Sequence, residues 1–250
     1  MKAMILAAGL GTRLRPWTER HPKALVPVGG VPMLERVIHS LASQGFDEIV
    51  VNVHHFASQI IDYLKTTRFE NVSVEVSDES GLLLDTGGGI VHAGDKLCAD
   101  NRPFLVHNVD ILTDADLRSL MERHESGEAD ATLLVSNRDS SRKLLADDSG
   151  KLVGWHNLNT DAYRPAGFIP DFTFRELAFS GIYALSPSAV AEMKSIFGDA
   201  PFPVMDFFLN ERRKSATVCD EQTFSIIDIG KPESLRRANE LFMGEASSNK

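Results

Sequence analysis

The feature that most constrains this fold is an alternation of short apolar runs with helical patterns, which begins at the first residues. Lys2–Ala8 is typical of a buried strand, and residues 32–43 carry apolar side chains at helical spacing before Gly45. Glu48–Val53 (EIVVNV) then indicates a second strand. A strand, a helix and a strand in this order favour a parallel sheet covered by helices. The pattern predicts a three-layer α/β/α Rossmann-like fold with a mixed, mostly parallel sheet.

The alternation continues to about residue 136 and then changes. Leu144–Trp155 and Glu176–Leu185 are typical of strands, and the polar stretch between them contains Pro and Gly without helical periodicity. We therefore expect a small β-rich insertion at about 146–179. Helical patterns return in three segments, which are 187–197, 205–213 and 231–243, with a strand at 223–227 before the last. We expect a single domain over 1–244 and a polar tail over 245–250.

Composition limits the classes of partner. The chain has 250 residues, 43% of them hydrophobic, and a formal net charge of -9, which argues against general binding to a nucleic acid backbone. No stretch approaches the roughly 20 apolar residues of a membrane span, and the apolar run in MKAMILAAG is too short for a signal peptide. Cys98 and Cys219 fit no disulfide or metal spacing, so we expect a cytoplasmic protein.

The stretch LAAGLGTRLRP, Leu6–Pro16, leaves the first predicted strand at the sheet edge where open α/β folds bind ligands. Gly9 and Gly11 allow backbone N–H groups to approach phosphate oxygens, and Arg13 adds a permanent positive charge. Leu14 stands where a dinucleotide fingerprint needs its third glycine, and no Walker motif occurs. The loop indicates phosphate binding of another kind, and a plain glycine turn is the alternative.

A second segment, HPKALVPVGGVPMLE, places Lys23 between Pro22 and Pro27, which stiffen the loop around the amine. Together, LAAGLGTRLRPWT and PKALVPVGGVPM closely resemble the signature of sugar-1-phosphate nucleotidyltransferases. In its motifs the chain is most similar to the N-acetylmuramate-1-phosphate uridylyltransferase and glucose-1-phosphate thymidylyltransferase types. The resemblance extends in order along nearly the whole chain, and it implies the nucleotide-diphospho-sugar transferase variant of the Rossmann-like fold.

The resemblance implies transfer of a nucleotidyl group from a nucleoside triphosphate to a sugar 1-phosphate, with release of pyrophosphate. Such a reaction needs positioning and charge neutralisation of two anions, so cations and Mg²⁺ are the expected catalysts. Arg13 and Lys23 are our candidates for catalytic residues that bind the triphosphate and stabilise the transition state, and surface ion pairing is the alternative role. Arg15 is a weaker candidate.

Two aspartates are candidate magnesium ligands. In PFLVHNVDIL, Asp110 ends an apolar strand at the same sheet edge, and Mg²⁺ prefers one or two carboxylates with phosphate oxygens and waters. The resemblance implies that Asp110 is a catalytic metal ligand, although Val109 stands where relatives usually carry glycine. It also implies a second ligand, Asp228 in SIIDIGKPESL, for which a turn or helix-capping role is the alternative.

The segment LLLDTGGGI carries three glycines at a predicted helix start, and a flexible turn is the alternative to a binding role. The resemblance assigns this segment to the nucleobase, and the DTGGG form favours UTP or dTTP, with GTP possible. The nucleotide-binding candidates are the following: Leu6, Ala8, Gly9, Gly11, Thr12, Arg13, Lys23, Asp85, Thr86 and Gly87.

On the acceptor side, many relatives carry a Glu-Lys-Pro segment, where this chain has KLVGWHNLN. The candidates for the sugar phosphate are the following: Asn108, Trp155, Asn157, Ser180 and Gly181. Neighbouring His54 and His55 would face opposite sides of a strand, so they cannot share one metal ion and are expected to line a loop. Three phenylalanines are expected to be core or subunit-contact residues: Phe202, Phe207 and Phe208.

The expected partners are a nucleoside triphosphate and a sugar 1-phosphate, with no nucleic acid and no membrane, in a monomer or small homo-oligomer. One alternative function is a cytidylyltransferase for phosphocholine-like alcohol phosphates, because the same glycine loop serves them. Another is a non-catalytic sugar-nucleotide sensor. A sensor would not need Arg13, Lys23, Asp110 and Asp228 together.

Overall fold

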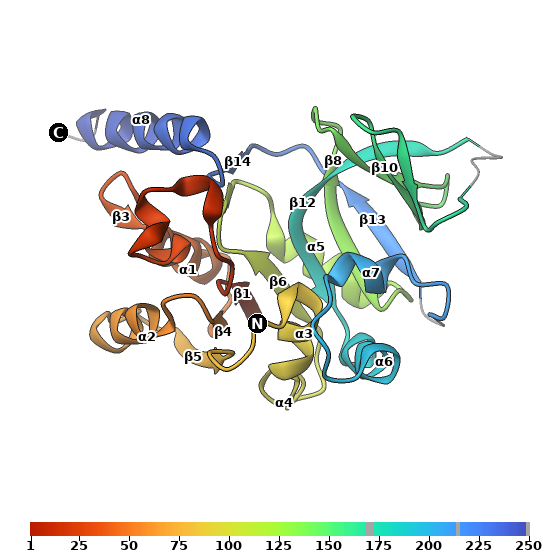
Figure 1. Cartoon of the computed structure of the whole chain (residues 1–250), viewed down its shortest axis with the longest axis horizontal. Coiled ribbons are helices and arrows are strands. Elements are labelled where there is room, and N and C mark those ends of the chain that lie inside the picture. The colour runs from red at the N-terminus through yellow and green to blue at the C-terminus, as the bar shows by residue number, and fades with distance from the viewer. Residues whose placement is uncertain (169–172, 214–215, 249–250) are drawn as a thin grey trace. The chain divides into compact units, whose positions relative to one another are not determined.

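A computed structural model describes residues 1–168, 173–213 and 216–248 (Figure 1). Its contacts divide the chain into two compact units. The first unit comprises Met1–Leu83, His107–Asp114 and Ser225–Lys250, and the second comprises Leu84–Val106 and Ala115–Phe224. The single domain expected over 1–244 stays a prediction. No helix in the described part of the chain is long and apolar enough to cross a membrane.

The first unit is built on three parallel strands, β1 (Lys2–Leu6), β4 (Glu48–Val53) and β5 (Ser73–Asp78), with β4 between the other two. Helix α1 (Met33–Ser43) lies in the connection from β1 to β4, and α2 (Ala57–Thr66) connects β4 to β5. β1 and β4 are almost wholly buried, which explains their continuous apolar runs. This β-α-β arrangement confirms the prediction for the first 80 residues.

Short elements complete the first unit. Between β1 and α1 the chain forms three single 3₁₀ turns, η1 (Thr12–Leu14), η2 (Trp17–Glu19) and η3 (Lys23–Leu25), and then a hairpin of β2 (Pro27–Val28) and β3 (Val31–Pro32). Strand β7 (Ile111–Thr113) pairs antiparallel with β14 (Ile226–Asp228). Helix α8 (Pro232–Ser248) follows β14 and extends beyond the predicted 231–243. Residues 249–250 of the expected tail lie outside the described residues.

In the second unit, strand β8 (Ala131–Ser136) pairs antiparallel with β12 (Arg175–Leu185) and parallel with β13 (Thr217–Glu221). The first residues of β12 pair with β9 (Arg142–Ala146), which leads by antiparallel pairing to β10 (Leu152–Asn157) and β11 (Ala162–Arg164). The β-rich insertion is therefore confirmed, and residues 169–172 within it lie outside the described residues.

The helices of this unit are α3 (Asp85–His92), α4 (Gly94–Leu97), α5 (Leu117–Ser126), α6 (Pro187–Phe197) and α7 (Val204–Phe208). Strand β6 (Phe104–Asn108) crosses the boundary between the units.

Several predicted boundaries are wrong for local reasons. Leu144–Trp155 is not one strand, because a turn separates β9 from β10: Asp147 Oδ1 accepts the N–H groups of Ser149 and Lys151, each at 2.9 Å, and Gly150 has φ +84°. In place of the strand predicted at 223–227, the structure has β14, which begins three residues later. A further strand, β13, precedes it. The helix predicted at 205–213 ends at Phe208.

Candidate active site

The glycine loop begins directly after β1, and its turn requires glycine at one position. Gly11 has φ +61°, and a Cβ added there would lie 2.9 Å from both Lys23 Cβ and Thr18 Cγ2. The Thr18 hydroxyl donates a hydrogen bond of 2.9 Å to the Gly11 carbonyl. A Cβ at Gly9 would meet nothing within 4 Å, and this residue is exposed. The loop therefore packs on the stem of Lys23 and leaves the Gly9 backbone open to a ligand.

A buried polar pair holds the base of this loop. The Ala7 N–H donates to Asn52 Oδ1 at 2.7 Å, and Asn52 Nδ2 donates to Glu79 Oε1 at 2.7 Å. Asn52 is 2% exposed and Glu79 3%, so both hydrogen bonds are shielded from water. The carbonyl of Glu79 also lies 2.6 Å from His54 Nδ1, while His55 Nε2 lies 3.4 Å from the Thr18 carbonyl. β4 ends at Val53, so the two histidines lie in the loop that follows it, as expected, and they contact different segments.

Lys23 and Asp110, 87 residues apart, form an ion pair between Lys23 Nζ and Asp110 Oδ2. Their side chains are only 12% and 16% exposed. Because water screens them poorly, their attraction exceeds that of a typical surface pair. The structure brings together the lysine and the first candidate metal ligand.

Asp110 and Asp228 lie on adjoining strand ends. The Ile229 N–H donates to the Asp110 carbonyl at 2.9 Å, and Asp228 is the register partner of Ile111 in the β7–β14 pair. Asp228 Oδ1 accepts the Gly230 N–H at 2.7 Å. The two carboxylates supply hard oxygen donors on neighbouring chain segments. Within the described residues, no group of three or more His, Cys, Asp or Glu side chains gathers as a metal site.

Arg13 reaches the same place from the glycine loop. A Cβ added to Gly230 would lie 2.6 Å from Arg13 Nη2 and 2.7 Å from Asp228 Oδ1. The guanidinium and the carboxylate therefore both border the space above Gly230. We call the group of Arg13, Lys23, Asp110 and Asp228 the charged cradle. All four residues belong to the first unit. Arg13 and Asp228 are exposed, as are the neighbouring Thr12 and Arg15.

The candidate base-binding segment lies in the second unit, except for Leu6 and the buried Ala8. Asp85 is exposed, has φ +60°, and accepts the Thr86 N–H at 2.6 Å. The Thr86 hydroxyl accepts the Val204 N–H at 2.8 Å, and a Cβ at Gly87 would lie 2.1 Å from the Phe202 ring. The glycines thus pack against a phenylalanine of the core, and the base-binding role stays a prediction. The prediction of core positions is confirmed for all three phenylalanines: Phe202, Phe207 and Phe208.

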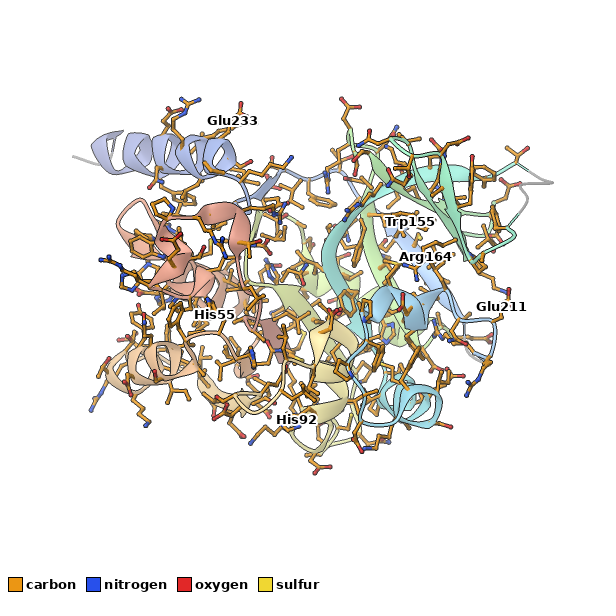
Figure 2. The ribbon with its side chains drawn as sticks, in the orientation of Figure 1. His55, His92, Trp155, Arg164, Glu211 and Glu233 are labelled. Atoms are coloured by element: carbon orange, nitrogen blue, oxygen red, sulfur yellow. The ribbon has the colours of Figure 1, made fainter. Side chains whose placement is uncertain are left out.

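The acceptor-side candidates are divided between the units. Asn108 ends β6 in the first unit, and Trp155 lies on β10 of the second (Figure 2), two residues before Asn157. Ser180 is buried, and its hydroxyl donates to the Leu134 carbonyl at 2.8 Å and accepts the Ile182 N–H at 3.1 Å. Gly181 has φ +80° at the register shift between β12 and β8. Ser180 and Gly181 therefore shape a β-bulge, and sugar-phosphate binding stays a prediction for all five candidates.

Comparison with known proteins gives the family. The model of the nucleotidyl transferase family matches residues 2–144, which include the glycine loop, Lys23 and Asp110. This chain belongs to the nucleotidyl transferase family. Among curated relatives of this nucleotidyl transferase, a mannose-1-phosphate guanyltransferase of Yarrowia lipolytica is 33% identical over 196 residues, covering 76% of this chain and 50% of the relative. The chain thus spans about half the length of that relative.

Two further comparisons extend the likeness. An N-acetylmuramate alpha-1-phosphate uridylyltransferase of Caulobacter vibrioides is 30% identical to this nucleotidyl transferase over 212 residues, covering 81% of each chain. The solved structure of a UDP-glucose pyrophosphorylase from Acinetobacter baumannii superposes with a TM-score of 0.77 at 18% identity, covering 100% of this chain and 99% of the other. At that identity the likeness shows the fold alone, and it confirms the predicted Rossmann-like class.

Two residues that matter to the geometry of this nucleotidyl transferase were not predicted. Asn52 is a polar residue within the apolar run EIVVNV, and that interruption is the signal that could have indicated a buried anchor. Gly230 follows Asp228 by two residues in IDIGK, but only the structure shows that the Arg13 guanidinium lies beside it. Asn52 accepts the Ala7 N–H at the base of the glycine loop, and the Gly230 N–H donates to Asp228 Oδ1, so each helps to position the candidate site.

Proposed function

We propose that this nucleotidyl transferase moves a nucleotidyl group from a nucleoside triphosphate to a sugar 1-phosphate, releasing pyrophosphate. The observation that carries the proposal is the charged cradle. Lys23 pairs with Asp110, Arg13 of the glycine loop and Asp228 both border Gly230, and a backbone hydrogen bond from Ile229 to Asp110 joins the two carboxylate segments. The family match and the names of its relatives support the same reaction class.

The physical demand of this reaction is to bring two anions into line. The attacking sugar phosphate is already ionised near neutral pH, so positioning and charge neutralisation matter more than a strong base. Arg13 presents a planar fork that can hold two phosphate oxygens, and Lys23 presents a compact charge. The exposed Gly9 backbone can approach the triphosphate closely, because no side chain stands there.

Magnesium is part of the proposal, and the donor set fits it. Asp110 and Asp228 are hard oxygen ligands on adjoining strand ends, and Mg²⁺ usually takes one or two carboxylates together with phosphate oxygens and waters. When bound, the metal would neutralise and orient the phosphates. Lys23 holds the Asp110 carboxylate in place through their ion pair.

The finer substrate assignment is also a proposal. The DTGGG segment and the Caulobacter vibrioides relative favour UTP, with dTTP next, and the guanyltransferase relative keeps GTP as a candidate. We propose soluble substrates, a cytoplasmic location on the basis of the cysteine spacing, and a monomer or small homo-oligomer.

The decisive experiment measures pyrophosphate release from UTP, dTTP, GTP and CTP, each with a panel of sugar 1-phosphates and with phosphocholine. We expect release with at least one sugar 1-phosphate and a uridine or thymidine triphosphate, and far slower release from the Asp110→Asn control. Release only from CTP with phosphocholine would favour the cytidylyltransferase. Binding of a nucleotide sugar without release from any pair would favour the sensor.

A further inference from the structure

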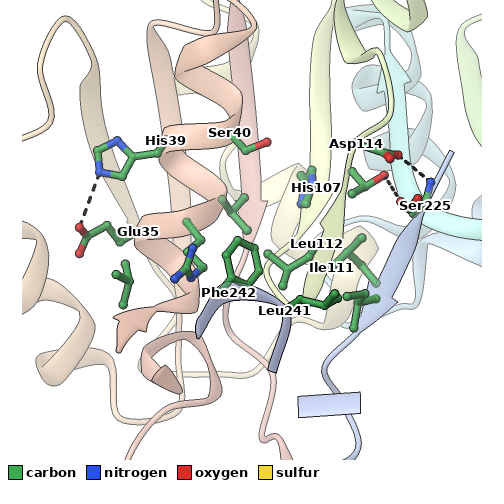
Figure 3. Close-up of a pocket in the computed structure, with 15 residues that line it drawn as sticks. Glu35, His39, Ser40, His107, Ile111, Leu112, Asp114, Ser225, Leu241 and Phe242 are labelled. Atoms are coloured by element: carbon green, nitrogen blue, oxygen red, sulfur yellow. Dashed lines mark hydrogen bonds and ion pairs between the residues drawn. The ribbon is translucent and has the colours of Figure 1, made fainter. Parts of the chain in front are cut away.

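A cavity of about 560 Å³ lies within the first unit, and no member of the charged cradle lines it. Its walls come from α1, β7, β14 and α8, and Figure 3 shows Ile111, Leu112, Leu241 and Phe242 gathered in it. The volume lies within the roughly 300–1,000 Å³ of small-molecule sites, which are also mostly apolar. The cavity therefore has the size and lining of a ligand site.

One buried polar group faces this cavity. His107 lies at the end of β6 and is only 3% exposed. Its Nδ1 lies 2.9 Å from the Asn108 carbonyl, so Nδ1 carries the hydrogen and Nε2 is left as an acceptor. Among the described residues, no donor pairs with Nε2. Burial lowers the pKa of the ring to about 4, so the ring is neutral at neutral pH.

Most charged residues around the cavity already have hydrogen-bond or ion-pair partners. Asp114 Oδ1 accepts the Ser225 N–H at 2.6 Å, and Glu35 and His39 lie 3.6 Å apart. The Arg36 guanidinium donates to the Val28 carbonyl at 2.7 Å and stacks 3.8 Å above the Phe242 ring. Ser40 on α1 adds a hydroxyl on the side where His107 lies (Figure 3). A phosphate in this cavity would lie against an apolar wall, and the Arg36 guanidinium already contacts the Val28 carbonyl and the Phe242 ring. The cavity therefore disfavours an ionic ligand.

We propose that this cavity binds a small, uncharged and mainly apolar molecule that donates one hydrogen bond to Nε2 of His107. Such a molecule would bury its apolar body against α8 and β7 and would donate its hydrogen bond to Nε2, the acceptor that His107 presents at the cavity wall. The proposal is independent of the nucleotidyl transfer assigned to the charged cradle.

The test compares two probes that differ by one donor, indole and 1-methylindole, by NMR titration of the full chain. We expect saturable shifts of the Ile111 and Leu112 methyl signals, with no change at Ile61 and Leu64, which line a separate groove. Indole should bind about fivefold more tightly than 1-methylindole, which corresponds to one neutral hydrogen bond of about 1 kcal/mol.

Three variants locate the interaction. His107→Phe should abolish the preference for indole, whereas the matched control His92→Phe, at an exposed histidine that does not line the cavity, should retain it. Ser40→Phe, on the side of α1 that lines the cavity, should weaken both probes and provides a second test if His107→Phe does not fold. The proposal is overturned by no saturable binding at the solubility limit of indole, by equal affinities of the two probes for the wild type, or by unchanged binding to Ser40→Phe.

Discussion

Replacing Gly230 by alanine adds one methyl group next to the side-chain ends of both Arg13 and Asp228. The new Cβ would lie 2.6 Å from Arg13 Nη2 and 2.7 Å from Asp228 Oδ1. Gly230 does not have a positive φ, so alanine introduces no backbone strain there. Because both atoms are ends of side chains, they can move aside while the fold is kept.

The size of the effect follows from these distances. Non-bonded heavy atoms separate to roughly 3.5 Å, so each group must retreat by about 1 Å. A misplacement of about 1 Å in a positioning group can cost about 100-fold in rate, or roughly 2.7 kcal/mol of transition-state stabilisation. We expect kcat/KM to fall about 100-fold and the free energy of unfolding to change by less than about 0.5 kcal/mol.

The assay is pyrophosphate release, with thermal unfolding measured on the same samples. Gly81→Ala is the matched control, because a Cβ at Gly81 would meet nothing within 4 Å and its φ is not positive. That variant should keep the wild-type rate. A folded Gly230→Ala protein with undiminished kcat/KM would refute the role given to the positions of Arg13 and Asp228 beside Gly230.

Two further predictions concern single side chains. Lys23→Ala should slow pyrophosphate release more than Arg15→Ala does, because Lys23 pairs with Asp110 whereas Arg15 is exposed. The reverse order of rates would mean that the wrong cation is assigned. Burial lowers the pKa of His107 to about 4, so the unfolded chain binds this proton first as the pH falls. As the pH falls from about 6.5 to 4, this residue should lower the free energy of unfolding of the wild type by about 3 kcal/mol. In denaturant titrations, His107→Phe should lack that part of the pH dependence. The same pH dependence of unfolding free energy in both proteins would contradict the prediction.

The sequence was sufficient for the elements with strong local periodicity. Glu48–Val53 and Pro187–Phe197 begin and end where they were predicted, because the first forms an apolar run and the second carries apolar residues on one helical face. Strands of two or three residues, such as β2 and β7, are too short to show a period. They depend on tertiary contacts that a local pattern does not contain.

The candidate site was predictable in its parts but not in its geometry. Asp110 could be placed near the glycine loop, because both follow strands at the carboxyl edge of one sheet. The ion pair of Lys23 with Asp110 could not be foreseen, because it joins segments 87 residues apart through side chains. The same holds for Asn52, whose hydrogen bond to Ala7 depends on the register of β1 with β4.

The central claim is that Asp110 and Asp228 act in one magnesium-dependent site, and a double-mutant cycle tests it most directly. Pyrophosphate release would be measured against Mg²⁺ concentration for Asp110→Asn, Asp228→Asn and the double variant. Each single change should remove most of the turnover, and the double variant should be no slower than the slower single variant, because residues that serve one ion are not additive. Losses that multiply, or full turnover by Asp110→Asn at limiting Mg²⁺, would contradict the account.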